Sequence, residues 1–379
     1  MAEMFAHGGN ARRQTRLGPP AMIVPMEFGI CLASRPDDLD YVVRAEELGF
    51  THCWMADSQM IWSDVYAMLA LAADRTTTMK IGTGVAVAPT RPAPVTAAAH
   101  ATINQLAPGR TFCGIGTGNT AMRTMGHKPM RIAEFEEYLE TLVPLMRGEE
   151  ADFAWRGDTA PVRHLMPDHG FVRFDPRIPV HVSAFGPRAL ALAARLGDGL
   201  ITSVPPDPAA VTALRGRLAD IGGENTARER FPMSSLTTML VLDEGESAGS
   251  ERCRRQTGAF AIAALHYTYE QWSQFGRPPG PHLEPMWEEY TAMLAAVPDD
   301  RRHQRIHLGH NCWVIPEEER FVTEDLIRRT CMVGTADELA EQVVALHDAG
   351  LDQLVLLPPL AEKESVIERV AAEVFPLLR

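Results

Sequence analysis

The stretch IGTGVAVAPTRPAPVTAAAHATINQLAPGRTFCGIG, residues 81–116, decides the fold class. An apolar run at 81–87 is followed by a segment of helical composition at 93–106 and by a second apolar run at 112–116. Two strands joined by a helix run parallel, because an antiparallel pair would not need so long a connection. The stretch therefore predicts one strand–helix–strand unit of a parallel sheet.

The same unit repeats along the chain. Apolar runs that read as strands lie at 28–32, 52–56, 81–87, 112–116, 180–185, 199–204, 235–242 and 353–359, and each precedes a helical segment. Eight such units favour an α/β fold of the (β/α)8 TIM-barrel type over an open doubly wound sheet. The site is then expected where strands end and loops begin.

The organisation around the barrel follows from the remaining segments. Residues 1–25 contain Arg12, Arg13 and Arg16 but lack the apolar core of a signal peptide, so we expect an N-terminal arm. Residues 26–379 are predicted to form a single barrel domain. Insertions are expected at about 149–179, which is rich in Pro, Gly and charge, and at about 265–321.

Composition excludes several classes of partner. The net charge is −13, from 36 basic and 49 acidic residues, so no positive field is available for nucleic acid or an anionic membrane. No apolar run is long enough to span a bilayer. The six cysteines form no C-x-x-C pair, which predicts reduced thiols and a cytoplasmic protein.

The glycines after the fourth predicted strand, in GIGTGN (114–119), superficially match a dinucleotide fingerprint. That fingerprint needs the first strand's turn, an immediate helix and an acidic residue ending the next strand, and none of these is present. A tight turn at the barrel rim is the simple alternative. Gly82 and Gly84 lie within a strand, which indicates that something approaches the backbone there; a flat ring would fit. Gly186-Pro187 begins a helix directly, which is typical of an anion site.

In their order, these pieces resemble the bacterial luciferase-like oxidoreductase superfamily. The closest likeness is to its deazaflavin-dependent branch, typified by methylenetetrahydromethanopterin reductase. The likeness rests on the GTGV strand with PTRPAPVTA after it, NQLAPGRT leading into GIGTGN, FGPRALALAARLGDG, and MVGTADELAEQVVALHDAGLDQLVLLPP. Together they cover most of the chain.

The resemblance implies a (β/α)8 barrel with a bulge and a non-prolyl cis peptide at Gly84-Val85, on which a flavin-type ring rests. It places the cofactor phosphate at the loop after strand four and the helix start after strand five. The implied cofactor-binding residues are Asp57, Ser58, Gly84, Val85, Gly116, Gly118, Asn119, Thr120, Ser183, Ala184, Phe185, Gly186 and Pro187. Asp57 could instead cap the helix that begins near Val65.

Three positions depart from the relatives. Sugar-phosphate dehydrogenases of the branch carry His and Glu where this chain has Ser58 and Asn119, and neither replacement can act as a general base near pH 7. The methanopterin reductases carry Glu where this chain has Cys31. These differences argue against a sugar phosphate and against a methanopterin as the substrate.

The second insertion supplies the other candidates. His307 and His310 could face the pocket and donate a proton or bind substrate; with Asn119 they are the candidate catalytic residues. His303 shares their spacing, but Gly309 interrupts the helix, so no metal site is predicted. The aromatics Tyr267, Tyr269, Trp272 and Trp287 could cap the pocket or simply pack an extra helix pair. Arg91 and His127 follow cofactor-lining segments and are further candidates.

The favoured function is hydride transfer between the deazaflavin coenzyme F420 and a small organic substrate. The alternative is an FMN-dependent two-component monooxygenase that uses O2 and takes reduced flavin from a partner reductase. A non-enzymatic flavin-binding barrel is the third possibility. The family commonly dimerises, so the resemblance implies a homodimer.

Overall fold

The computed structural model describes residues 26–378, so the predicted arm at 1–25 lies outside the described residues. Its centre is a closed barrel of parallel strands in the order β1-β12-β9-β8-β7-β4-β3-β2. The strands are β1 (Glu27–Ala33), β2 (His52–Ala56), β3 (Lys80–Val87), β4 (Thr111–Gly116), β7 (Val180–Ser183), β8 (Gly199–Thr202), β9 (Met233–Thr237) and β12 (Gln353–Leu356). The predicted (β/α)8 class is confirmed.

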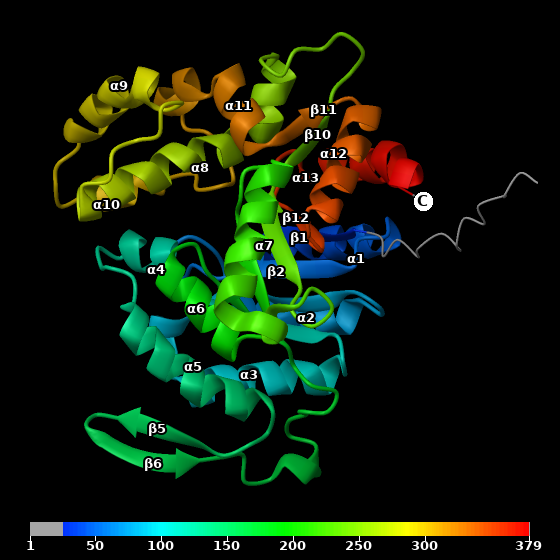
Figure 1. Ribbon diagram of the computed structural model, residues 1–379, viewed down its shortest axis with the longest axis vertical. Coiled ribbons are helices and arrows are strands. Elements are labelled where there is room, and N and C mark those ends of the chain that lie inside the picture. The colour runs from blue at the N-terminus through cyan, green and yellow to red at the C-terminus, as the bar shows by residue number, and fades with distance from the viewer. Residues whose placement is uncertain (1–25, 379) are drawn as a thin grey trace, which may run out of the picture.

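Helices cover the outside of the barrel (Figure 1). They are α1 (Leu39–Glu47), α2 (Val65–Arg75), α3 (Ala93–Leu106), α5 (Ile132–Met146), α6 (Pro187–Leu196), α7 (Pro208–Gly222), α12 (Ala336–Asp348) and α13 (Lys363–Arg369). Local sequence fixes several helix ends. At α12, Thr335 Oγ1 accepts from Glu338 N while Glu338 Oε2 accepts from Thr335 N at 2.8 Å, a capping box. Among residues 26–378, no helix combines the length and apolarity needed to cross a membrane.

Two apolar cores hold the barrel. The larger one lies between the strands and the covering helices. The smaller one fills the barrel interior and includes Trp54 and Phe112, whose ring centroids are 4.4 Å apart. All six cysteines are free and buried, as expected of residues that act as small hydrophobic side chains.

The structure corrects two expectations. The predicted strand at 235–242 is two strands: β9 ends at Thr237, and β10 (Met239–Val241) pairs with β11 (Met332–Gly334) outside the barrel. Nearly every residue of the run is buried, including Ser235, Thr237 and Thr238, so its pattern carries no sign of the break. The predicted loop after strand four begins with a short helix, α4 (Asn119–Thr124).

Two excursions lie on opposite sides of the barrel in Figure 1. The first carries an antiparallel hairpin, β5 (Ala151–Trp155) and β6 (Asp158–Val162), at the bottom of the view. The second carries α8 (Glu251–Phe275), α9 (Glu284–Ala295), α10 (Arg302–Ile306) and α11 (Glu324–Thr330), gathered at the top. Hydrogen bonds join α8 and α4 below it, so the second excursion reaches the rim of the barrel.

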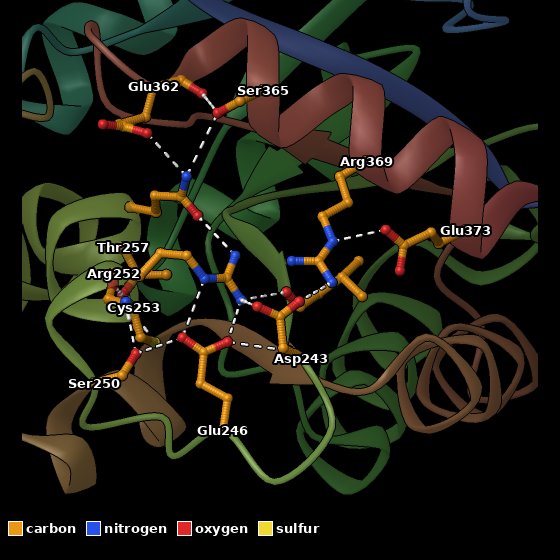
Figure 2. Close-up of polar contacts among 12 residues, drawn as sticks. Asp243, Glu246, Ser250, Arg252, Cys253, Thr257, Glu362, Ser365, Arg369 and Glu373 are labelled. Carbon is orange, nitrogen blue, oxygen red and sulfur yellow. Dashed lines mark hydrogen bonds and ion pairs between the residues drawn. The ribbon is translucent and has the colours of Figure 1, made fainter.

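The start of α8 is held by a polar network (Figure 2). Ser250 caps the helix, and the Arg252 guanidinium donates to the Val241 carbonyl at 3.0 Å. One turn further along, Gln256 Nε2 donates to Glu362 Oε2 at 2.9 Å, next to the C-terminal helix α13. These contacts fix the direction in which α8 leaves the barrel.

Candidate functional site

A cavity of about 830 Å³ opens at the C-terminal ends of the barrel strands. Residues that end or follow strands line it, as the barrel rule predicts. The residues that line it include all but two of the predicted cofactor-binding set: Asp57, Ser58, Gly84, Val85, Gly116, Gly118, Asn119, Thr120, Ser183, Phe185 and Gly186. Ala184 is buried and Pro187 begins α6; neither side chain is part of the wall.

Strand β3 carries the predicted irregularity. The Gly84-Val85 peptide is cis, and the register with β4 shifts between Thr83 and Ala86, so both expectations are confirmed. The structure adds a reason for glycine at 84 that was not expected, because an added Cβ would lie 2.6 Å from Trp54 Cβ. The Cβ and backbone of Trp54 on β2 therefore already leave no room for a side chain at residue 84. Val85 lines the cavity floor.

The strand-four rim depends on one left-handed residue. Gly118 has φ +76° and is the N-cap of α4. An added Cβ would meet Val87 Cγ1 at 2.6 Å, so glycine is required both by its dihedral and by space. This turn brings the backbone of residues 118–120 into the cavity wall.

The start of α6 faces the cavity beside that rim. Gly186 is extended, with φ −94° and ψ 161°, and Pro187 occupies the first turn. Leu190 N bonds to Gly186 O at 2.9 Å, which makes it the first amide in the ladder of this helix. The backbone amides of Arg188 and Ala189, both cavity-lining residues, precede that bond and therefore have no partner within the helix.

Asp57 follows β2 and is not a helix cap. Its Oδ2 accepts a hydrogen bond from Val87 N at 3.2 Å, which joins the ends of β2 and β3. The helix-capping role belongs to Asp64, whose Oδ1 accepts from Tyr66 N and Ala67 N. Burial raises the pKa of Asp57, and the hydrogen bond from Val87 partly opposes this.

The second excursion places His310 and Asn311 in the cavity wall. The following residue, Cys312, ties this segment to two other loops: its carbonyl accepts from Leu360 N at 3.0 Å, and its Sγ accepts from Trp62 Nε1 at 3.4 Å. Burial lowers the pKa of His310 well below its ordinary value, so the ring is neutral at pH 7.

A buried carboxylate behind the wall was missed by the sequence analysis. Glu270 on α8 is 4% exposed; its Oε2 accepts from Asn119 Nδ2 at 3.0 Å and lies 3.4 Å from Arg123 Nε. Its Oε1 lies 2.7 Å from His307 Nε2, an ion-pair distance without hydrogen-bond alignment. Asn119 and His307, both predicted candidates, therefore meet at one carboxylate, although His307 itself is not part of the wall.

The aromatic residues of α8 and α9 divide between two roles. Tyr267 lines the cavity. Tyr269, Trp272 and Trp287 pack against one another with ring centroids 5.6–6.3 Å apart, as the helix-packing alternative predicted. The sequence does not indicate which of the four aromatic residues lines the cavity, because all of them lie in one aromatic-rich segment.

The remaining candidates lie elsewhere. Arg91 pairs with Asp64 at 2.6 Å and covers the Tyr66 ring, outside the wall. His127 does not line the cavity either. His303 packs near Gly126, and among the residues that the structure describes no group of three or more His, Cys, Asp or Glu side chains is arranged to hold a metal.

Charge is distributed unevenly around the cavity. Six of the charged residues in its wall come from the β4–α5 segment and the start of α6: Arg123, Lys128, Arg131, Glu134, Glu137 and Arg188. Asp57 is the other one. The wall contributed by the ends of β1, β9 and β12 and by the second excursion contains apolar and neutral polar side chains. The cavity therefore has a charged half and an uncharged half.

The closed parallel barrel, the bulge in β3 and the glycine rim are the features that the resemblance to the luciferase-like class of oxidoreductase barrels implied. Residues 25–353 match the family model described as "Luciferase-like monooxygenase", so the chain belongs to that family, as predicted.

Two relatives and one solved structure extend this result. The 5,10-methylenetetrahydromethanopterin reductase of Archaeoglobus fulgidus is 27% identical over 365 residues, which cover 93% of this chain and 100% of the relative. An F420-dependent glucose-6-phosphate dehydrogenase of Beutenbergia cavernae is 26% identical over 361 residues, covering 90% and 93%. The coenzyme F420-dependent tetrahydromethanopterin reductase from Methanopyrus kandleri has the same fold, with a TM-score of 0.68 and 20% identity over 94% of this chain and 100% of that one.

Proposed function

We propose that this chain is an oxidoreductase that binds the deazaflavin coenzyme F420 and transfers a hydride to or from a small organic substrate. The observation that carries the proposal is the cavity itself, in which the Val85 bulge lies beside the glycine rim and the start of α6. The name of the Beutenbergia cavernae relative, an F420-dependent glucose-6-phosphate dehydrogenase, supports the choice of F420.

The residues present fit a flavin-type group. Val85 provides an apolar floor for a planar ring, and Gly118 keeps the rim free of a side chain. The free amides of Arg188 and Ala189 suit a phosphate. When bound, a deazaflavin gives or takes a hydride, whereas FMN also reacts with O2.

The charged half of the cavity favours F420 over FMN. The F420 tail continues beyond its phosphate into a chain that carries carboxylates, while FMN ends at the phosphate. Lys128 and Arg188 are exposed cations on this side and can pair with such a tail. Arg131 is already paired with Glu134.

The chain's own groups then position the substrate. His310 is neutral and lies in the wall, where it can hydrogen-bond substrate and relay a proton. His307 lies behind it, with ring centroids 5.3 Å apart. Asn119 orients a ligand through its amide, and Glu270 holds that amide in place. We also propose the homodimer, the cytoplasmic location and the single domain at 26–379 with insertions at about 149–179 and 265–321.

The alternative is a two-component monooxygenase that uses FMN, O2 and a partner flavin reductase. The family description "Luciferase-like monooxygenase" favours this alternative. A non-enzymatic flavin-binding barrel is disfavoured, because the cavity's uncharged half leaves a separate wall for a substrate.

Titration of the purified protein with F420 and with FMN, followed by quenching of cofactor fluorescence, tests the proposal. We expect F420 to bind more tightly, and the Lys128→Gln, Arg188→Gln double variant to weaken F420 binding about tenfold, since charge-assisted contacts are lost. Arg217→Gln, at an exposed arginine of α7 outside the cavity, is the control. Tighter FMN binding with O2-dependent turnover would establish the alternative, and binding of neither cofactor would refute both.

A further inference from the structure

Three aromatic side chains stand exposed at the cavity mouth. Phe185, Tyr267 and Phe275 line the cavity and are 54%, 42% and 56% exposed. Rings of Phe185 and Tyr267 are 6.1 Å apart with an interplanar angle of 41°. Exposed aromatic groups that converge on a cavity are typical of a binding surface, because each gains from burial against a ligand.

The two aromatics of α8 share one helix face. Tyr267, Gln271, Gln274 and Phe275 are spaced by four, three and one residues, and all of them line the cavity. The network at Arg252 fixes the start of this helix (Figure 2), and Glu270 fixes it near its C-terminal end against α4. The face is therefore held over the cavity by contacts at two points.

The wall below these aromatics is uncharged. Cys31, Leu236 and Leu357 come from barrel strands or their ends, and Trp62 and the neutral His310 complete it. A charged substrate group placed here would lose water without gaining a partner, which costs free energy.

Arg277 is a cation close to the α8 face. Its Cζ lies 5.2 Å from the centroid of the Phe275 ring, and its Nη1 donates to Gln271 Oε1 at 3.1 Å, but it does not line the cavity. The cations that do line the cavity come from the segment after β4 and from the start of α6. One of them, Arg123, donates to Gln274 Oε1 on the α8 face, and its charge is paired with Glu270 at 3.4 Å.

We propose that the uncharged half binds a neutral aromatic or polycyclic substrate, held between the aromatic trio Phe185, Tyr267 and Phe275 and the apolar wall. This rests on the proposed function, because the charged half is assigned to the cofactor. It excludes phosphorylated sugars and carboxylates as the substrate class.

A matched pair of probes tests the proposal: 2-naphthol, which is neutral at pH 7, and 2-naphthoate, which carries a carboxylate on the same ring system. Titrations of the full chain by ligand fluorescence should give a dissociation constant for 2-naphthol about tenfold or more below that for 2-naphthoate. Glucose 6-phosphate should not compete. Equal or tighter binding of 2-naphthoate, or competition by glucose 6-phosphate, would overturn the proposal.

Variants locate the binding surface. Phe275→Ala should weaken 2-naphthol binding about fivefold to tenfold and leave the F420 dissociation constant unchanged. Phe171→Ala, at a residue that is 63% exposed and outside the cavity wall, is the control. Unchanged 2-naphthol binding by Phe275→Ala refutes the placement. If the unmodified chain does not bind F420, the proposed function is refuted instead. The ratio of the dissociation constants for 2-naphthol and 2-naphthoate still decides the substrate class in that case.

Discussion

His100 makes the stability of the barrel depend on pH. This residue of α3 is 0% exposed; its Nδ1 donates to Thr96 O at 2.9 Å, and its Nε2 lies 3.3 Å from Thr83 Oγ1 on β3. Burial lowers its pKa from 6.5 to about 4. The ring is thus neutral in the folded protein over the pH range in which the unfolded chain takes up a proton.

The size of the effect follows from these two pKa values. A histidine whose folded pKa lies below its unfolded pKa stabilises the protein fully above pH 6.5, and this contribution falls as the pH drops toward 4. Between pH 7.5 and pH 5 the free energy of unfolding should fall by about 2 kcal/mol because of His100 alone. Burial also lowers the pKa of His181 to about 4, which adds acid sensitivity in the same direction.

Urea unfolding of the parent protein and of His100→Gln at pH 7.5 and pH 5, followed by far-UV circular dichroism, measures the contribution of His100 to the pH dependence of the free energy of unfolding. Other titrating groups are common to both proteins and cancel, so the pH-dependent loss should be about 2 kcal/mol smaller in the variant. His169→Gln, at an exposed histidine, should behave like the parent. If His100→Gln loses as much stability as the parent between the two pH values, the reasoning is wrong.

Two further substitutions test the stability of the cavity rim and of helix α3. Gly118→Ala would place its Cβ 2.6 Å from Val87 Cγ1, at a residue whose φ is +76°. We expect this variant to lower the free energy of unfolding by about 1–3 kcal/mol and to weaken F420 binding. The control Gly216→Ala, at a residue with open space around it, should be neutral or stabilising. Equal urea midpoints for the two variants would contradict this. Asn104→Ala removes a buried amide that bonds three backbone groups and should lower the free energy of unfolding by about 3 kcal/mol. The control Thr102→Ala, at an exposed residue of the same helix, should change the free energy of unfolding little. Comparable losses of stability in the two variants would refute this role of Asn104.

Sequence reasoning reached the barrel because its signals are local. Each strand and its helix are adjacent in the chain, and capping residues such as Thr335 mark the helix ends. The bulge at Gly84 was predicted from the family resemblance, but the steric contact with Trp54 that requires this glycine was not. The Trp54 Cβ and backbone atoms that exclude a side chain there belong to the neighbouring strand β2, so the β3 sequence cannot identify them.

The division of the run at 235–242 shows a similar limit. Both β9 and β10 are buried, so neither hydrophobicity nor composition distinguishes a barrel strand from one that pairs outside it. Asn104 shows that a residue in a motif shared with the family can have a structural role. In the NQLAPGRT motif that supports the family resemblance, its amide organises the backbone around residues 109, 173 and 176 rather than a ligand.

The sequence by itself determined the alternation of strands and helices, the glycine rim and the family, because these depend on residues close together in the chain. Only the tertiary structure decided what the second excursion contributes. Asn119 and Glu270 are 151 positions apart and meet at 3.0 Å because α8 is directed over α4. The same geometry places His310 and the aromatic trio at the mouth and separates the charged half of the cavity from the uncharged half. Such contacts depend on helix direction and packing, which no local pattern specifies.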